Sequence, residues 1–254
     1  MTNTSNSARV SPSASAEGDT FLSIQGVSKS FGGVKALTDV SFEVERNSVT
    51  SLIGPNGAGK TTLFNCITGF ARGDVGTVTF NGIDITSKPG HKVARLGMVR
   101  TFQNIRMLRD LTVYESLICA RSNDGAGAKQ QHARANELIE RLKLTKSANR
   151  VCSTLPLLAQ RTIEVARALM TSPEMILFDE PTAGATNQER QLLAGLIGDL
   201  RGLGTTVMVI EHNVPFVMDV SDHIVVLDFG KKVADGTPTE IAQNPLVQEI
   251  YLGA

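Results

Sequence analysis

The chain has 254 residues, of which 25 are lysine or arginine, 25 are aspartate or glutamate and 41% are hydrophobic. These proportions exclude an intrinsically disordered chain, and the zero net charge argues against binding nucleic acid or anionic lipid through bulk charge. No apolar run approaches the ~18 residues that a membrane span needs, and the three cysteines form no CxxC pair, which suits a reducing compartment.

The first twenty residues are rich in serine, alanine, asparagine and threonine. They contain neither the basic n-region nor the apolar h-region of a secretory signal. We therefore expect residues 1–20 to be a disordered tail, residues 21–254 to form the folded domain, and the chain to remain in the cytoplasm.

After the tail, the sequence begins with strand signals. Alternating apolar residues predict half-buried antiparallel strands at Leu22–Val27 and Val40–Val44, and the apolar Val49–Ile53 predicts a more deeply buried strand. Gly76–Phe80 followed by Asn81-Gly82 predicts a strand that runs into a tight hairpin turn.

The middle of the chain favours helix instead. Helices are predicted at Val113–Arg121, Lys129–Leu142 and Leu157–Met170, which suggests a helical subdomain at about 104–171, inserted in an α/β core. Beyond it, Met175–Phe178 and Thr206–Ile210 predict buried parallel strands joined by a crossover helix.

A phosphate-binding motif is the strongest chemical signal. Residues 54–61 match G-x-x-x-x-G-K-[ST] between a predicted strand and a helix that begins near Lys60. Glycines let backbone N–H groups surround phosphates, Lys60 supplies a positive charge to the β- and γ-phosphates, and the Thr61 hydroxyl can coordinate Mg²⁺. The alternative is a glycine-rich turn that only caps a helix. The predicted phosphate contacts are Gly54, Pro55, Asn56, Gly57, Ala58, Gly59, Lys60, Thr61 and Thr62.

A second acidic site follows the strand at Met175–Phe178. Asp179 at the end of the strand can reach Mg²⁺, and Glu180 can polarise an attacking water. An apolar run that ends in Asp-Glu is also a common helix-initiating pattern, and only the pairing with the phosphate loop favours the catalytic interpretation.

With these motifs, Phe21 to Ala254 resembles the nucleotide-binding subunit of an ABC transporter. The resemblance implies a P-loop NTPase fold with a mostly parallel sheet, an antiparallel β subdomain and an inserted helical subdomain. It also implies ATP and Mg²⁺ as cofactors and ATP hydrolysis as the activity. Phe31 would stack on adenine, Gln103 of the Q-loop would touch Mg²⁺ and the attacking water, and His212 would bond the γ-phosphate.

The finer resemblance is to importer subunits for branched-chain amino acids and related amides. It lies in Arg100–Val113, Val209–Asp222, Ala234–Pro238 and Tyr251–Gly253. It implies transmembrane permease subunits as partners, which would dock around residues 104–110, and indirectly a solute-binding protein. The chain would then be a peripheral protein on the inner face of the cell membrane.

One family motif departs from its usual sequence. The signature segment Leu-Ser-x-Gly-Gln is replaced by Leu155-Pro156-Leu157-Leu158-Ala159, and Ala183–Asn187 also differs from the usual Ala-Gly-Leu-Asn-Pro. The signature grips the γ-phosphate bound to the partner subunit, and losing one such donor typically costs ~3 kcal/mol. Pro156 removes a hydroxyl and an N–H, and Leu158 removes a close backbone approach. We therefore expect a heterodimer with a non-identical ATP-binding subunit.

Two further interpretations remain open. One is a catalytically weak regulatory subunit of an ABC heterodimer, which binds nucleotide but turns it over slowly. The other is a non-transport ABC protein of DNA repair or translation, which the neutral charge disfavours, so no nucleic-acid partner is expected.

Overall fold

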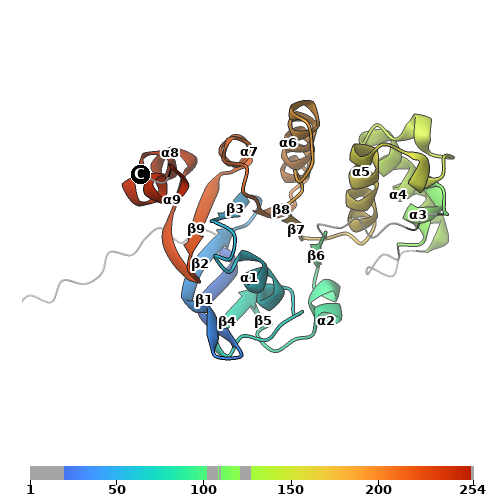
Figure 1. Ribbon diagram of the computed structural model, residues 1–254. Coiled ribbons are helices and arrows are strands. Elements are labelled where there is room, and N and C mark those ends of the chain that lie inside the picture. The colour runs from blue at the N-terminus through green and yellow to red at the C-terminus, as the bar shows by residue number, and fades with distance from the viewer. Residues whose placement is uncertain (1–19, 102–107, 109, 121–126, 253–254) are drawn as a thin grey trace, which may run out of the picture.

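The computed structural model describes residues 20–101, 108, 110–120 and 127–252, and two sheets organise them (Figure 1). The smaller sheet is antiparallel, with strand order β2-β1-β4-β5. Its strands are β1 (Thr20–Phe31), β2 (Val34–Glu45), β4 (Val75–Phe80) and β5 (Ile83–Asp84). The expected antiparallel strands are confirmed and are longer than predicted. Thr20, which we assigned to the tail, is instead the first residue of β1, because it pairs with Glu45.

The hairpin turn at Asn81-Gly82 is confirmed. Both residues have positive φ, 48° and 73°, which is the backbone geometry that a two-residue turn between twisted strands requires.

The larger sheet is mostly parallel, with strand order β10-β9-β3-β8-β7-β6 and only β10 antiparallel to its neighbour. Its strands are β3 (Val49–Ile53), β6 (Met98–Arg100), β7 (Met175–Asp179), β8 (Thr206–Ile210), β9 (His223–Asp228) and β10 (Lys231–Gly236). Every residue of β3, β7 and β8 is buried, as expected for central parallel strands. Because these strands are parallel neighbours, their carboxyl ends meet at one edge, where ligands of open α/β sheets bind.

Helices cover both faces of the larger sheet (Figure 1). The helices are α1 (Lys60–Ile67), α2 (Gly90–Arg95), α3 (Val113–Ile118), α4 (Ala128–Arg141), α5 (Leu157–Leu169), α6 (Asn187–Gly202), α7 (Val214–Val220), α8 (Pro238–Gln243) and α9 (Pro245–Leu252). Short 3-10 turns lie at Thr145–Ser147 and Cys152–Thr154. One core packs α1 between the two sheets, and a second core packs α3–α7 on the opposite face.

The helices α3, α4 and α5 gather at the β6 end of the sheet, far from the C-terminal helices α8 and α9 (Figure 1). The three helices expected there are confirmed, although α3 ends at Ile118, earlier than predicted. Within the ranges that the structure describes, no helix combines the length and the apolar character that a membrane crossing demands.

Candidate nucleotide-binding site

The phosphate loop joins β3 to α1, as the motif predicted. Gly57 and Gly59 have φ values of +82° and +99°, which side chains rarely tolerate. A Cβ on Gly59 would lie 2.6 Å from the carbonyl oxygen of Ala36, whereas a Cβ on Gly57 would meet nothing within 4 Å. Gly59 is therefore needed for packing against the small sheet, whereas the space beside the Gly57 backbone is open.

Lys60 begins α1 and is 6% exposed. Its Nζ donates hydrogen bonds to the carbonyl oxygens of Gly54 (2.7 Å) and Pro55 (2.9 Å). Burial lowers the pKa of Lys60, and the nearby negative charge of Glu180 opposes that shift. The ammonium group is thus held inside the loop, next to the predicted catalytic carboxylate.

A cavity of about 200 Å³ brings the phosphate loop and the second acidic site together. It is lined by Ala36, Asn56, Gly57, Ala58, Gly59, Lys60, Thr61, Thr62 and Glu180. Glu180, more than a hundred residues from the loop in sequence, therefore faces the space in which the loop would hold phosphates.

Asp179 ends β7 and has a partner that the sequence analysis missed. Arg100, the last residue of β6, donates to the Asp179 Oδ2 at 2.5 Å and to the Asn65 Oδ1 of α1 at 2.7 Å. Both charged side chains are almost fully buried. No local sequence pattern pointed to Arg100, because its contact with Asp179 depends on the pairing of β6 with β7, which places Arg100 beside Leu177.

The described residues contain no cluster of three or more histidine, cysteine or acidic side chains that would form an all-protein metal site. Mg²⁺ usually takes only one or two protein oxygen ligands in addition to phosphate oxygens and water. Thr61 lines the cavity and its hydroxyl is an oxygen donor of that kind, so it fits a nucleotide-bound Mg²⁺. The Asp179 carboxylate is a second oxygen donor nearby, but it does not line the cavity and its Oδ2 accepts from Arg100.

Glu180 and His212 lie at the ends of neighbouring strands. The backbone N–H of Glu180 donates to the carbonyl oxygen of Ile210 (3.0 Å), the last residue of β8, and His212 follows two positions later. The His212 side chain is 56% exposed, with its Nδ1 3.8 Å from the Glu211 Oε2. Glu211, which the sequence analysis did not single out, is fully buried.

The structure describes Phe31 but not Gln103. Phe31 ends β1 at the tip of the small sheet, with a ring that is 53% exposed and available for stacking. The Lys29 Nζ lies 5.2 Å from the ring centroid. Gln103 and most of residues 104–110 lie outside the described residues.

The signature segment forms the start of α5. Pro156 is the N-cap residue, one position before the first helical turn in which prolines are common, and no side chain caps this helix end. Leu157 is 46% exposed, and Leu158 packs against the core of the helical region. The segment at 183–187 ends in a capping box, in which Thr186 and Glu189 close the start of α6.

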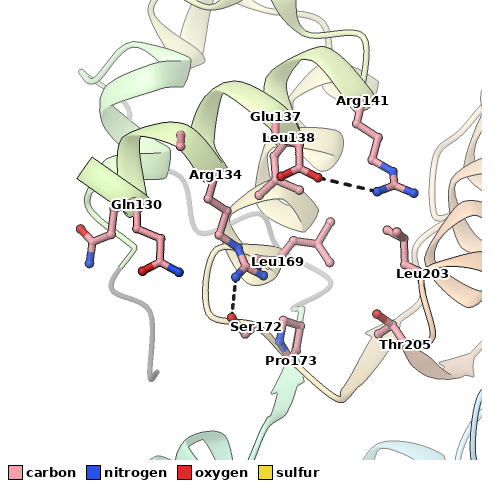
Figure 2. Close-up of a pocket in the computed structure, with 12 residues that line it drawn as sticks. Gln130, Arg134, Glu137, Leu138, Arg141, Leu169, Ser172, Pro173, Leu203 and Thr205 are labelled. Carbon is pink, nitrogen blue, oxygen red and sulfur yellow. Dashed lines mark hydrogen bonds and ion pairs between the residues drawn. The ribbon is translucent and has the colours of Figure 1, made fainter. Parts of the chain in front are cut away.

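A larger cavity of about 520 Å³ lies elsewhere, between α4, the turn after α5 and the loop before β8. Figure 2 shows Arg134 pointing from α4 toward Ser172, with Glu137 and Arg141 paired along the same helix. No residue of the phosphate loop lines this cavity, so its size does not make it the nucleotide site.

The site near β3 thus combines the uncapped start of a helix, a buried ammonium group, a hydroxyl oxygen and a carboxylate that faces the cavity. This arrangement suits transfer of a terminal phosphoryl group to water.

Comparisons with known proteins identify the family of the chain. Residues 37–183 match the family model for ABC transporters, and residues 231–254 match the model for branched-chain amino acid ATP-binding cassette transporters. The high-affinity branched-chain amino acid transport ATP-binding protein BraF of Pseudomonas aeruginosa is 42% identical, covering 91% of this chain and 97% of BraF. The corresponding protein LivG of Salmonella typhimurium is 41% identical with the same coverage.

Among solved structures, an ATP-binding cassette of an ABC transporter in its ADP conformation superposes with a TM-score of 0.83 at 34% identity. The match covers 92% of this chain and 99% of that one. The antiparallel sheet, the mostly parallel sheet and the helices are thus those of a known cassette. The chain belongs to the ATP-hydrolysing, ATP-binding proteins of ABC transporters, in the branched-chain amino acid group.

Proposed function

We propose that this chain binds Mg-ATP in the loop at 54–62 and hydrolyses it with Glu180, to drive import of branched-chain amino acids or related amides through membrane subunits. The observation that carries the proposal is the shared cavity, in which Glu180 faces Lys60 and the phosphate loop. When bound, Mg²⁺ would supply positive charge that offsets the negative charge of the phosphates. Thr61, Asp179 and Gln103 would hold it, Glu180 would orient the water, and His212 would bond the γ-phosphate. Phe31 would stack on the adenine.

The resemblance to importer subunits supports roles for the helical subdomain and for the partners of the chain. The helical subdomain at about 104–171 would face the permease subunits, with residues 104–110 as the docking segment. The chain would then sit peripherally on the inner face of the cell membrane, and a solute-binding protein would supply the transported molecule.

The partner in the ATP-binding dimer would be a different subunit. The start of α5 carries Pro156, which has neither an N–H nor a hydroxyl, and exposes Leu157, so it presents a poor phosphate-binding surface to a partner. In a heterodimer, this chain's loop would work against the partner's intact signature, and the opposite site would stay occupied but slow. Brisk and positively cooperative hydrolysis by the purified chain alone would contradict this arrangement.

The same observation supports a second candidate, a nucleotide-binding regulatory subunit that hardly turns ATP over. Single-turnover hydrolysis with the partner subunit present separates the two candidates, because a regulatory subunit would retain ATP without cleaving it.

The test of the main proposal is the Glu180→Gln variant. Removing the carboxylate while keeping its size is expected to slow single-turnover hydrolysis by ~10²- to 10⁴-fold and to leave ATP affinity nearly unchanged. The matched control is Glu137→Gln, which alters an exposed carboxylate on α4. Hydrolysis by Glu180→Gln at the rate of the parent would overturn the assignment.

A further inference from the structure

The loop between β7 and α6 begins with Glu180 and holds it in an unusual conformation. Glu180 has a φ of +48°, a left-handed backbone that typically costs an L-residue about 1–2 kcal/mol. Such a conformation persists only when its surroundings fix it. The contacts that fix this loop therefore decide where the Glu180 carboxylate points.

Glu211 makes one set of these contacts. Its Oε1 accepts a hydrogen bond from the backbone N–H of Thr182 (2.7 Å), two residues after Glu180. Its Oε2 accepts from the backbone N–H groups of His212 (3.0 Å) and Asn213 (3.3 Å). One fully buried carboxylate thus ties the loop that carries Glu180 to the segment that carries His212.

The backbone of Glu211 adds a third connection. Its N–H donates to the carbonyl oxygen of Leu52 in β3 (3.3 Å), two residues before the phosphate loop begins at Gly54. The backbone that carries the Glu211 side chain is therefore anchored to the strand from which the phosphate loop starts.

Arg161 holds the same loop through its carbonyl groups. It lies on α5, and its two terminal nitrogens donate to the carbonyl oxygens of Pro181 and Ala183, on either side of Thr182. A planar guanidinium can bridge two acceptors in this way, whereas a lysine amine acts as a single point. Burial lowers the pKa of Arg161, and the charges of Glu189 and Glu211 oppose that shift. The guanidinium and the Glu211 carboxylate thus act on one loop and on each other.

We propose that Glu211 and Arg161 are positioning residues, which clamp the loop at 180–183 and the start of the segment at 212–213 so that Glu180 and His212 face one phosphate. This inference rests on the proposed roles of Glu180 and His212. Through Arg161, α5 remains useful to this chain's own site although its signature residues have changed.

A purely structural role makes a different prediction. A buried carboxylate always needs donors, so Glu211 could simply satisfy backbone N–H groups that burial would otherwise leave unpaired. Losing such a role would lower the fraction of folded chain, and nucleotide binding and hydrolysis would then fall together. Losing a positioning role would lower kcat and leave KM and nucleotide affinity unchanged.

The decisive variant is Glu211→Gln in the full chain. Glutamine keeps the size, but its amide nitrogen cannot accept, so either Thr182 or the pair His212 and Asn213 loses its acceptor. A displacement of ~1 Å at a reacting group can lower the reaction rate by ~10²-fold. We therefore expect the rate constant of hydrolysis, measured in a single turnover, to fall by about that factor, and kcat to fall with it. The KM for ATP and the equilibrium affinity for ADP are expected to stay within about twofold at temperatures well below Tm.

Arg161→Lys provides an independent second variant. It is expected to lower kcat in the same way, and the double variant is expected to lose less than the product of the two single effects, because both residues hold one loop. The matched controls are Glu240→Gln and Arg134→Lys. Glu240 accepts from the N–H of Thr237 in the cap of α8, and Arg134 binds Ser172 and the carbonyl oxygen of Leu169.

Three outcomes would overturn the inference. They are an unchanged kcat in Glu211→Gln and Arg161→Lys, parallel losses of affinity and kcat, or strictly multiplicative effects in the double variant. The Glu180→Gln variant distinguishes these results from failure of the proposed function. If Glu180→Gln is inactive while Glu211→Gln is fully active, only the positioning role fails.

Discussion

The helices α1 and α5 begin in similar ways but differ in what their first turns can bind. Neither has a side-chain cap, whereas α3, α6 and α8 each begin with a complete capping box. At α1 the uncapped N–H groups open onto a cavity with Gly57 and Lys60 beside it. At α5 the first turn, which is also uncapped, instead begins with Pro156, Leu157 and Leu158.

The difference shows that helix formation and phosphate binding place separate demands on a sequence. Pro156 has no N–H and provides a φ of −55°, and its carbonyl oxygen accepts the first helical bond from Gln160 (3.0 Å), so α5 starts as well as α1 does. The first turn of α5 lacks the hydroxyl of the usual serine and the glycine that would let a phosphate approach the backbone closely. The helix can therefore be retained for packing and for Arg161 while its first turn loses its ligand-binding chemistry.

The largest expected effect lies at α1. Lys60→Ala removes the buried ammonium group beside the phosphate loop, and a charged hydrogen bond of this kind contributes ~1.5–3 kcal/mol, or about 10- to 150-fold in affinity. We therefore expect equilibrium titration with Mg-ATP to give a dissociation constant raised by about that factor.

Lys92→Ala is the control, because Lys92 is an exposed lysine on α2. Equal affinities of Lys60→Ala and the parent would remove the contrast between the two helix starts.

A smaller effect is expected when α5 is made to resemble a binding helix. Pro156→Ser together with Leu158→Gly restores a hydroxyl and a close backbone approach, and one such donor is worth ~10²-fold in rate. A gain of about tenfold or more in the steady-state hydrolysis of the chain alone is expected, since glycine in the first turn also weakens the helix by ~1 kcal/mol.

Leu192→Gly tests whether loosening an exposed leucine on α6 has the same consequence. No gain from the restored signature, or an equal gain from Leu192→Gly, would mean that Pro156 and Leu158 do not limit hydrolysis.

The smallest effect concerns the support behind the phosphate loop. Tyr251 of α9 packs in the core that contains Ile53, and burial raises its pKa to about 12, partly offset by the backbone of nearby Gly54. Because the phenol is a stronger acid in the unfolded chain, its stabilisation is complete below pH 10 and is lost as pH rises through that window toward 12.

Between pH 10 and pH 12, the Tm of Tyr251→Phe is expected to fall by about 2–4 °C less than the Tm of the parent. In a chain of this size, that difference corresponds to ~1 kcal/mol. Identical slopes for Tyr251→Phe and the parent would show that α9 does not contribute through this hydroxyl.

Local patterns were sufficient for much of the fold. Val49–Ile53 and Thr206–Ile210 are strands with the predicted bounds, because nine of their ten residues are apolar or β-branched, which matches a strand that is buried on both faces. The start of α1 at Lys60 followed from the glycine motif. Short elements such as α2 and α7 were not predicted, since six or seven residues show too little periodicity.

The candidate site was predictable where a motif is continuous in sequence and not where contacts are distant. The loop at 54–62 and the pair Asp179 and Glu180 could be named in advance. Arg100 and Glu211 could not, because their importance depends on strand pairing and on backbone N–H groups contributed by other segments. For Glu211, the sequence feature to notice is an acidic residue directly after the apolar strand Thr206–Ile210.

Arg100 has one more consequence. Its guanidinium spans from Asn65 on α1 to Asp179 on β7, and Gln103 follows only three positions later in the chain. A displacement of the chain just beyond β6 would therefore be transmitted by one side chain both to the helix behind the phosphate loop and to the carboxylate that we propose as a cation ligand. A permease subunit that binds the chain just after β6 would therefore act through Arg100 on both α1 and Asp179.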